Sequence, residues 1–268
     1  MLVLFSGGFG YFLSSKGIVD YSRLSYFLLG GFMITGAANI LNQVFEKDLD
    51  KLMKRTQNRP LPTERLSINE AVGFSMFLLA GGFLLLISKV NVPTAFLTLT
   101  SLILYALVYT PMKRISPFSV LVGAFPGAMP PLIGWVANTG SISVEALVIF
   151  GIQFIWQFPH FWAIAWVADE DYKRAGFKML PSSGGRNLKT AFQIMIYTLF
   201  LIPLGLLPTK FGIVGINSAI ILTVCGVLFL AQTFNLMKEC TDKAAKQIMF
   251  GSFLYLPIVQ LTLIFDKV

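Results

Sequence analysis

Charged and amide side chains are unusually dense between Asn42 and Pro62, in a chain whose flanking segments are apolar. Asn42, Glu46 and Asp50 recur every fourth residue, so on an α-helix each lies only about 40° round from the last. Asp48 points to roughly the opposite side, where we expect a solvated or salt-bridged surface charge. Carboxylate and amide oxygens suit a Mg²⁺ ion that also holds a substrate phosphate. The spacing therefore predicts a metal site in which Glu46 and Asp50 hold the ion and Asn42 assists.

Two arginines follow this acidic face in the string RTxxRPL, at Arg55 and Arg59. A guanidinium group is a planar fork of donors that matches phosphate oxygens, so the two predict binding of a diphosphate. The alternative is that the acids only pair with nearby lysines and that the basic residues only anchor a membrane loop. The regular spacing of Asn42, Glu46 and Asp50 together with RTxxRPL favours the metal-diphosphate site.

Two further clusters offer side chains of the same kinds. The string YTPMKR at 109–114 ends in Lys113 and Arg114, which are candidates for holding diphosphate or are topological anchors. Residues 169–171 supply a second carboxylate cluster, which could clamp the same diphosphate through metal or be a solvated helix end. Lys173 and Lys178 follow it and are additional candidates for diphosphate binding.

His160 is the only histidine, and it lies in the aromatic apolar string WQFPHFW at 156–162. An ionisable residue at membrane depth is a functional hypothesis by default. His160 could bind a haem or act as a base, and the alternative is a neutral histidine hydrogen-bonded to a helix carbonyl. Helical rise places it roughly 15 Å from the acidic cluster, too deep for a diphosphate.

The elements that must position these side chains are membrane helices. Of 268 residues, 55% are hydrophobic and 13% charged, with a mean hydropathy of +0.72, which excludes an ordinary soluble domain. Met1 to about Leu13 is apolar but short, and we expect a truncated first helix there. Eight further spans are predicted at 22–45, 70–88, 93–109, 118–137, 143–167, 190–208, 211–236 and 247–265. The fold class is therefore all-α, with about nine transmembrane helices in a single domain over 1–268.

The basic residues follow the topology of such a bundle. Four loops, at 46–69, 110–117, 168–189 and 237–246, carry 16 of the 21 Lys and Arg residues, so we assign that side to the cytoplasm. Because topology explains the sequence pI of about 9.5, nucleic acid is excluded as a partner. The same loops hold 9 of the 13 acidic residues, which the orientation rule does not require. Chemistry on the cytoplasmic face would explain them.

Glycine and proline recur inside the spans, most densely in GAFPGAMPPLIGW at 123–135. Kinks and close helix contacts explain such residues in a membrane protein, and room for a flat, bulky ligand between helices explains them equally well. Cys225 and Cys240 form no CxxC or CxxCH motif, so we expect packing residues rather than a disulfide or a haem attachment site.

Several strings together resemble one family. NxxxExDxDxxMxRTxxRPL at 42–61, YTPMKR at 109–114, the 123–135 string and PHFWAIAW with DYKRAGFKMLP at 159–181 look like the protohaem IX farnesyltransferases (haem O synthases), a branch of the UbiA-type intramembrane prenyltransferases. The resemblance covers the chain from about Gly10. The RTxxRPL and PHFW…DYxxAGxxMLP strings are specific to the haem branch.

The resemblance implies a nine-helix bundle around a central cavity, with Mg²⁺ and two Asp-rich motifs at its cytoplasmic mouth. Asn42, Glu46 and Asp50 match the first motif, and Asp171 matches the acid retained in the second, as a metal ligand. The superfamily DxxxD pattern is absent, because Lys173 stands four residues after Asp169. Relatives also carry a Lys-Pro-Arg-like sequence before the first helix, which this chain lacks.

The implied reaction transfers a farnesyl group from farnesyl diphosphate to a vinyl group of haem b, giving haem O and diphosphate. It serves haem O and haem A biosynthesis for terminal oxidases, in a bacterial inner membrane. Haem A synthase and a terminal oxidase, which would use the product, are the candidate protein partners. The alternatives are a prenyltransferase for an aromatic quinone precursor and, more distantly, a transporter, for which we see no clear inverted repeat.

Overall fold

The computed structural model describes residues 2–182 and 184–268, and the regular elements in this part of the chain are helices, as predicted. They are α1 (Leu2–Ser14), α2 (Tyr21–Phe45), α3 (Lys47–Asp50), α4 (Ile68–Lys89), α5 (Val92–Ile103), the π-helical η1 (Leu104–Tyr109), α6 (Thr110–Met112), α7 (Ser119–Thr139), α8 (Val144–Val167), α9 (Asp169–Arg174), α10 (Leu188–Lys210), α11 (Ile216–Glu239) and α12 (Asp242–Phe265).

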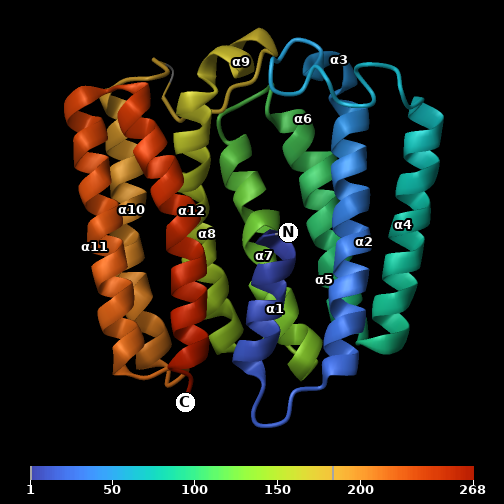
Figure 1. The fold of residues 1–268 in the computed structure, drawn as a ribbon, viewed down its shortest axis with the longest axis vertical. Coiled ribbons are helices and arrows are strands. Elements are labelled where there is room, and N and C mark those ends of the chain that lie inside the picture. Colours follow the sequence, from blue (N-terminus) through green and yellow to red (C-terminus); the bar gives the residue numbers. More distant parts are fainter. Residues whose placement is uncertain (1, 183) are drawn as a thin grey trace.

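Eight helical segments of the described chain are long and apolar enough to cross a membrane, with α5, η1 and α6 forming one of them. The 13-residue α1 rises only about 20 Å, less than the roughly 30 Å hydrocarbon core, as its short apolar run predicts. These nine segments of residues 2–182 and 184–268 stand side by side (Figure 1). One group is formed by α2, α4 and α5, and the other by α10, α11 and α12. Helices α7 and α8 lie between the two groups.

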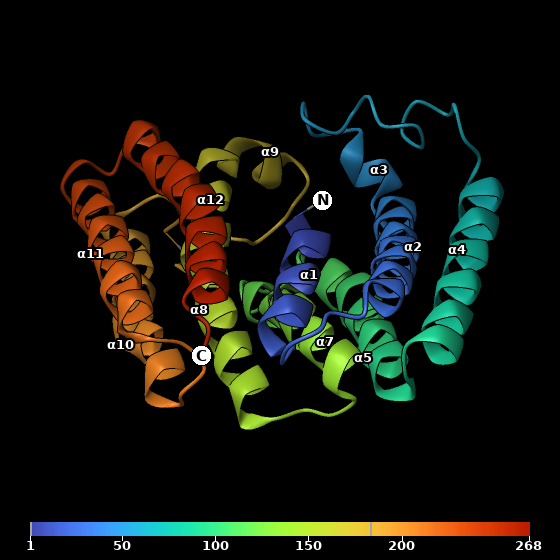
Figure 2. The same cartoon turned by 60° about the horizontal axis from the view of Figure 1, so that its bottom comes forward.

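The four charged loops gather at one end of this bundle. The short helices α3 and α9 lie there over the ends of the long helices, and the opposite end carries only short connections (Figures 1 and 2). Large apolar side chains such as Phe77, Leu84 and Leu254 are more than half exposed on the outside, where lipid would cover them. The predicted segregation of charge is thus confirmed.

Helix bounds differ from the predicted spans where polar residues lie at a helix end. The predicted span at 211–236 begins as a helix only at Ile216, because Gly212 has a positive φ of 68° and the chain turns there. The last helix begins five residues earlier than predicted, at Asp242, where the Thr241 hydroxyl caps the amide of Ala244. Hydropathy misses these charged first residues of the helix.

Glycines allow α1 to pack directly on α7. A Cβ atom on Gly134 would lie 1.9 Å from the carbonyl oxygen of Gly7, and one on Gly10 would lie 2.0 Å from that of Pro131. Moving a side chain could not relieve such a contact, because the new Cβ atom would meet main-chain atoms of the other helix. Close helix approach therefore explains part of the Gly- and Pro-rich string of α7.

The prolines in this string of α7 have a different structural consequence. Pro131 has no N–H, so the carbonyl of Gly127 one turn earlier has no intrahelical donor. Side chains of α8 replace that donor: the amides of Gln153 and Gln157 donate to the Gly127 oxygen at 2.9 and 3.0 Å. Gln260 of α12 donates to the Gln153 side chain at 2.9 Å. A buried polar network thereby joins α7, α8 and α12 within the membrane zone.

Candidate functional site

A cavity of about 440 Å³ extends from the charged end into the bundle, between helices from both groups. Its volume is in the range of small-molecule sites. Of the residues singled out in the sequence, it is lined by Asn42, Glu46, Asp50, Arg55, Arg59, Lys113 and His160. Trp156, Phe161, Tyr105, Tyr109 and the α7 residues Gly123, Pro126, Gly127 and Pro130 add flat and apolar surface. Both readings of the α7 string, close packing and room for a ligand, therefore apply.

The predicted shared face of Asn42, Glu46 and Asp50 is confirmed, although the helix is not continuous. The α2 helix ends at Phe45, and Glu46 takes a non-helical conformation before α3. The four-residue hydrogen-bond register survives the break, with Glu46 N donating to Asn42 O at 3.0 Å and Asp50 N to Glu46 O at 2.7 Å. Asp48 is exposed and lies 3.9 Å from Lys51, as expected for a surface charge.

Asp50 is fully buried at the mouth of the cavity. Its Oδ2 accepts a hydrogen bond of 2.8 Å from Arg59 Nη1. Its Oδ1 is buried and has no hydrogen-bond partner among the described residues. A buried carboxylate oxygen in that condition costs free energy unless a cation or donor reaches it.

Glu46 and Lys113 form a second buried ion pair, with Lys113 Nζ 2.8 Å from Glu46 Oε1. Burial lowers the pKa of the Lys113 ammonium, and the Glu46 carboxylate opposes that shift. The ammonium also lies 4.7 Å from the centre of the Tyr109 ring. Lys113 is therefore a charge directed into the site rather than a loop anchor in the headgroup region.

The Asn42 amide is oriented through the π-helical turn. Its Nδ2 donates to Thr110 Oγ1 at 3.0 Å, and that hydroxyl donates to Tyr105 O at 2.9 Å. The Thr110 amide bonds the same Tyr105 carbonyl, five residues back. Since Nδ2 is the atom directed towards Thr110, the Asn42 side-chain oxygen remains available to a ligand in the cavity.

These residues fit a magnesium ion that is also coordinated by substrate. No group of three or more His, Cys, Asp or Glu side chains gathers closely enough among the described residues to hold a metal alone. Mg²⁺ commonly takes only one or two carboxylates, with water and substrate phosphates completing its shell. The partnerless Oδ1 of Asp50, the Glu46 carboxylate and the Asn42 amide supply donors of that kind.

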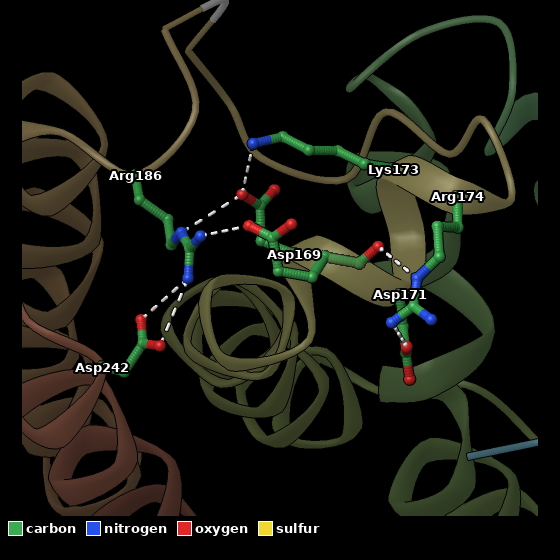
Figure 3. A network of polar contacts seen from close by, with 7 residues as sticks. Asp169, Asp171, Lys173, Arg174, Arg186 and Asp242 are labelled. Carbon is green, nitrogen blue, oxygen red and sulfur yellow. Dashed lines mark hydrogen bonds and ion pairs between the residues drawn. The ribbon is translucent and has the colours of Figure 1, made fainter. Parts of the chain in front are cut away.

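The second acidic cluster is positioned differently. Asp171 Oδ1 accepts from Arg174 Nη2 at 2.6 Å and from the Lys54 amide at 3.4 Å, so it connects α9 to the loop after α3. Asp169 pairs with Lys173 at 2.8 Å and with Arg186, which also contacts Glu170 and Asp242 (Figure 3). Neither Asp171 nor Lys173, Lys178 or Arg114 lines the cavity.

Helix α9 and the loop after it nevertheless contribute to the cavity. Tyr172, Phe177 and Met179 line it, and the Lys178 amide donates to the carbonyl of Lys113 at 2.7 Å. Burial raises the pKa of the Tyr172 phenol, and the Arg55 guanidinium opposes that shift. Arg186 fixes the far end of this loop on α12, and sequence reasoning did not single it out.

His160 lines the deeper part of the cavity and is mostly buried. Trp156 stacks on its ring at 4.4 Å, and the side-chain oxygen of Ser252 lies 2.8 Å from its Nδ1. Gln153 and Gln157 line the cavity nearby and were also missed. Their signal was readable in the sequence. Two glutamines four residues apart in an apolar span share a helix face, and Phe161, the neighbour of His160, continues that face.

A membrane helix bundle with a cavity that is charged at its mouth and aromatic inside defines a polytopic membrane protein with a small-molecule site. Residues 3–256 match the model of the UbiA prenyltransferase family. The chain belongs to the UbiA prenyltransferase family and is an integral membrane protein.

Curated relatives extend over nearly the whole chain. A protein named protoheme IX farnesyltransferase from Cytophaga hutchinsonii is 53% identical over 99% of this chain and 93% of its own length. One of that name from Flavobacterium psychrophilum is 44% identical over 99% of this chain and 90% of its own. The mitochondrial protein of that name from Arabidopsis thaliana is 35% identical over all of this chain and 62% of its own.

Solved structures share the fold. A structure of digeranylgeranylglyceryl phosphate synthase superposes with a TM-score of 0.83 at 22% identity, over 99% of this chain and 92% of that one. A UbiA homologue from Archaeoglobus fulgidus, bound to GPP and Mg²⁺, gives 0.64 at 15% identity, over 98% of this chain and 93% of that one.

Proposed function

We propose that this chain is a Mg²⁺-dependent prenyltransferase that moves the farnesyl group of farnesyl diphosphate onto a vinyl group of haem b, giving haem O and diphosphate. The observation that carries the proposal is the Asn42, Glu46 and Asp50 face at the mouth of a cavity that His160 lines further in. The 44–53% identity to proteins named protoheme IX farnesyltransferase supports the choice of acceptor.

The mouth of the cavity would bind the diphosphate. Glu46 and Asp50 would hold Mg²⁺, which neutralises charge on the departing diphosphate. The Archaeoglobus homologue, bound to GPP and Mg²⁺, supports a role for Mg²⁺ with the diphosphate substrate. Arg59 and Lys113 now pair with the two carboxylates, and in the complex they would turn to phosphate oxygens, with Arg55 beside them.

The side chains further out would act on the same group indirectly. Asp171 is proposed as an additional metal ligand once Arg174 releases it. Lys173, Lys178 and Arg114 supply positive charge around the entrance and would attract the diphosphate. Residues 1–268 would act together as a single prenyltransferase domain.

The apolar interior of the cavity would protect the allylic carbon, C1, of farnesyl diphosphate from bulk water. When the C–O bond of farnesyl diphosphate breaks, the cavity wall excludes bulk water from the cationic C1 atom. The terminal vinyl carbon of haem b attacks C1, and the resulting cation on the other vinyl carbon is captured by one water molecule, which loses a proton. No protein nucleophile is required.

His160 is proposed to contact the haem. It lies seven residues before the end of α8, about 10 Å below the charged end by helical rise. A porphyrin whose vinyl group reaches the diphosphate extends inward to that depth. Trp156 and Phe161 provide aromatic area for its flat face.

The charged end is proposed to face the cytoplasm of a bacterial cell, at the inner membrane, because 16 of the 21 Lys and Arg residues lie in the loops of that end. Haem O would pass from there to haem A synthase or a terminal oxidase.

A choice between two acceptors tests the proposal. Membranes containing the chain would receive farnesyl diphosphate, Mg²⁺, haem b and an aromatic quinone precursor together, and the products would be identified by mass spectrometry. The proposal predicts farnesylated, hydroxylated haem. Prenylation of the aromatic compound alone would favour a prenyltransferase for a quinone precursor. No prenyl transfer to either acceptor would contradict the proposed enzymatic function.

A further inference from the structure

The hydrogen bond between His160 and Ser252 has only one consistent arrangement of protons. The Ser252 hydroxyl donates to the carbonyl oxygen of Met249 at 2.6 Å, which uses its one hydrogen atom. Its oxygen can then only accept from His160, whose Nδ1 is 2.8 Å away. Nδ1 therefore carries the proton of the neutral ring, and Nε2 keeps its lone pair.

The surrounding side chains hold the ring in that orientation. Trp156 stacks on it with an interplanar angle of 16°, and Phe253 meets it edge-on at 5.0 Å. Trp156 is itself held by a 3.1 Å hydrogen bond from its Nε1 to the carbonyl oxygen of Ser252. A single residue of α12, which is fully buried, thus contacts both the imidazole and the indole through different atoms.

Nε2 has no comparable partner in the described part of the chain. His160 lines the cavity, and Nε2 makes no hydrogen bond to any of the described residues. A neutral imidazole whose Nε2 lone pair has no hydrogen-bond donor is the form that ligates a metal, and iron is the metal that a haem would bring to this depth. Ligating histidines almost always donate their other N–H to an acceptor, which fixes the tautomer and raises ligand basicity.

We propose that Ser252 is a positioning residue for the acceptor, holding His160 as the Nδ1–H tautomer so that Nε2 ligates the iron of haem b. The inference rests on the proposed function and deepens it. The single histidine limits this chain to one axial bond. Bond formation at Nε2 transfers no proton and no electron, so the ligated haem keeps its oxidation state.

Haem titration of the purified full chain tests the proposal, followed by the Soret band and by the iron–histidine stretching band in resonance Raman spectra. His160→Ala should abolish the iron–histidine band. Ser252→Ala should weaken haem affinity about tenfold, the lower end of losses seen when such partners are removed, and shift the band. Binding of farnesyl diphosphate should not change in either variant.

Ser75→Ala is the matched control, because Ser75 is equally buried and its hydroxyl donates to the Ala37 carbonyl, at 3.5 Å. It should leave the haem spectra unchanged. If Ser252→Ala does not fold, Ser252→Cys provides a near-isosteric side chain with a weaker acceptor, and the iron–histidine band should move to lower frequency.

Two failures are distinguishable. If His160→Ala keeps the wild-type haem spectrum and affinity, His160 does not bind haem, and that part of the proposed function is wrong together with the inference. If His160→Ala changes the spectrum while folded Ser252 variants keep the wild-type band and affinity, His160 binds haem without Ser252, and only the inference is overturned.

Discussion

The buried ion pair between Glu46 and Lys113 gives a prediction whose size follows from burial. The two side chains are 5% and 11% exposed and their charged atoms lie 2.8 Å apart. Lys113→Met would leave the Glu46 carboxylate buried beside Asp50 without its partner. Breaking a buried pair from one side costs about 3–5 kcal/mol. At 2–4 °C per kcal/mol, Tm should fall by about 6–20 °C.

Thermal unfolding of the purified protein in detergent measures this change. The double variant Glu46→Gln with Lys113→Met removes both charges and should recover most of the lost stability. Lys51→Met is the matched control, because Lys51 is 43% exposed and pairs with an 89% exposed Asp48, and such pairs contribute about 1 kcal/mol at most. A Lys113→Met variant as stable as wild type, or a double variant as unstable as the single one, would refute the reasoning.

Further predictions concern packing and substrate binding. Gly134→Ala should lower the free energy of unfolding by about 1–3 kcal/mol, because the new Cβ meets the Gly7 carbonyl at 1.9 Å. Gly73→Ala, with nothing within 4 Å, should be neutral or stabilising in the same denaturation assay. Arg55→Lys and Arg59→Lys should each raise KM for farnesyl diphosphate despite the conserved charge, since an ammonium lacks the guanidinium fork; unchanged KM in both would make them topological anchors only.

Local spacing predicted the shared face of Asn42, Glu46 and Asp50 well. The four-residue repeat of Asn42, Glu46 and Asp50 survives because backbone hydrogen bonds keep the register across the break at Glu46. Hydropathy likewise located the spans, since lipid contact demands apolar length whatever the packing. The RTxxRPL and YTPMKR strings led to Arg55, Arg59 and Lys113, all of which line the cavity.

Contacts between distant segments were not predictable in this way. The Glu46–Lys113 pair joins residues 67 apart, and the His160–Ser252 hydrogen bond joins residues 92 apart. Composition marks Ser252 as one small polar residue among many, and only the packing of α12 on α8 gives it a partner. The hydrogen bond from the Lys54 amide to Asp171 likewise joins residues 117 apart and depends on how α9 lies over the charged end.

The most direct test of the central claim is the yield of haem O as a function of Mg²⁺ in wild type and in Asp50→Asn. Product would be quantified by mass spectrometry after incubation with farnesyl diphosphate and haem b, with the Asp48→Asn variant as a surface control. We predict that wild type and Asp48→Asn form haem O with Mg²⁺ and none after chelation by EDTA. Asp50→Asn should form none at any Mg²⁺ concentration while remaining folded. Near-normal haem O formation by Asp50→Asn, or by wild type in EDTA, would contradict the account.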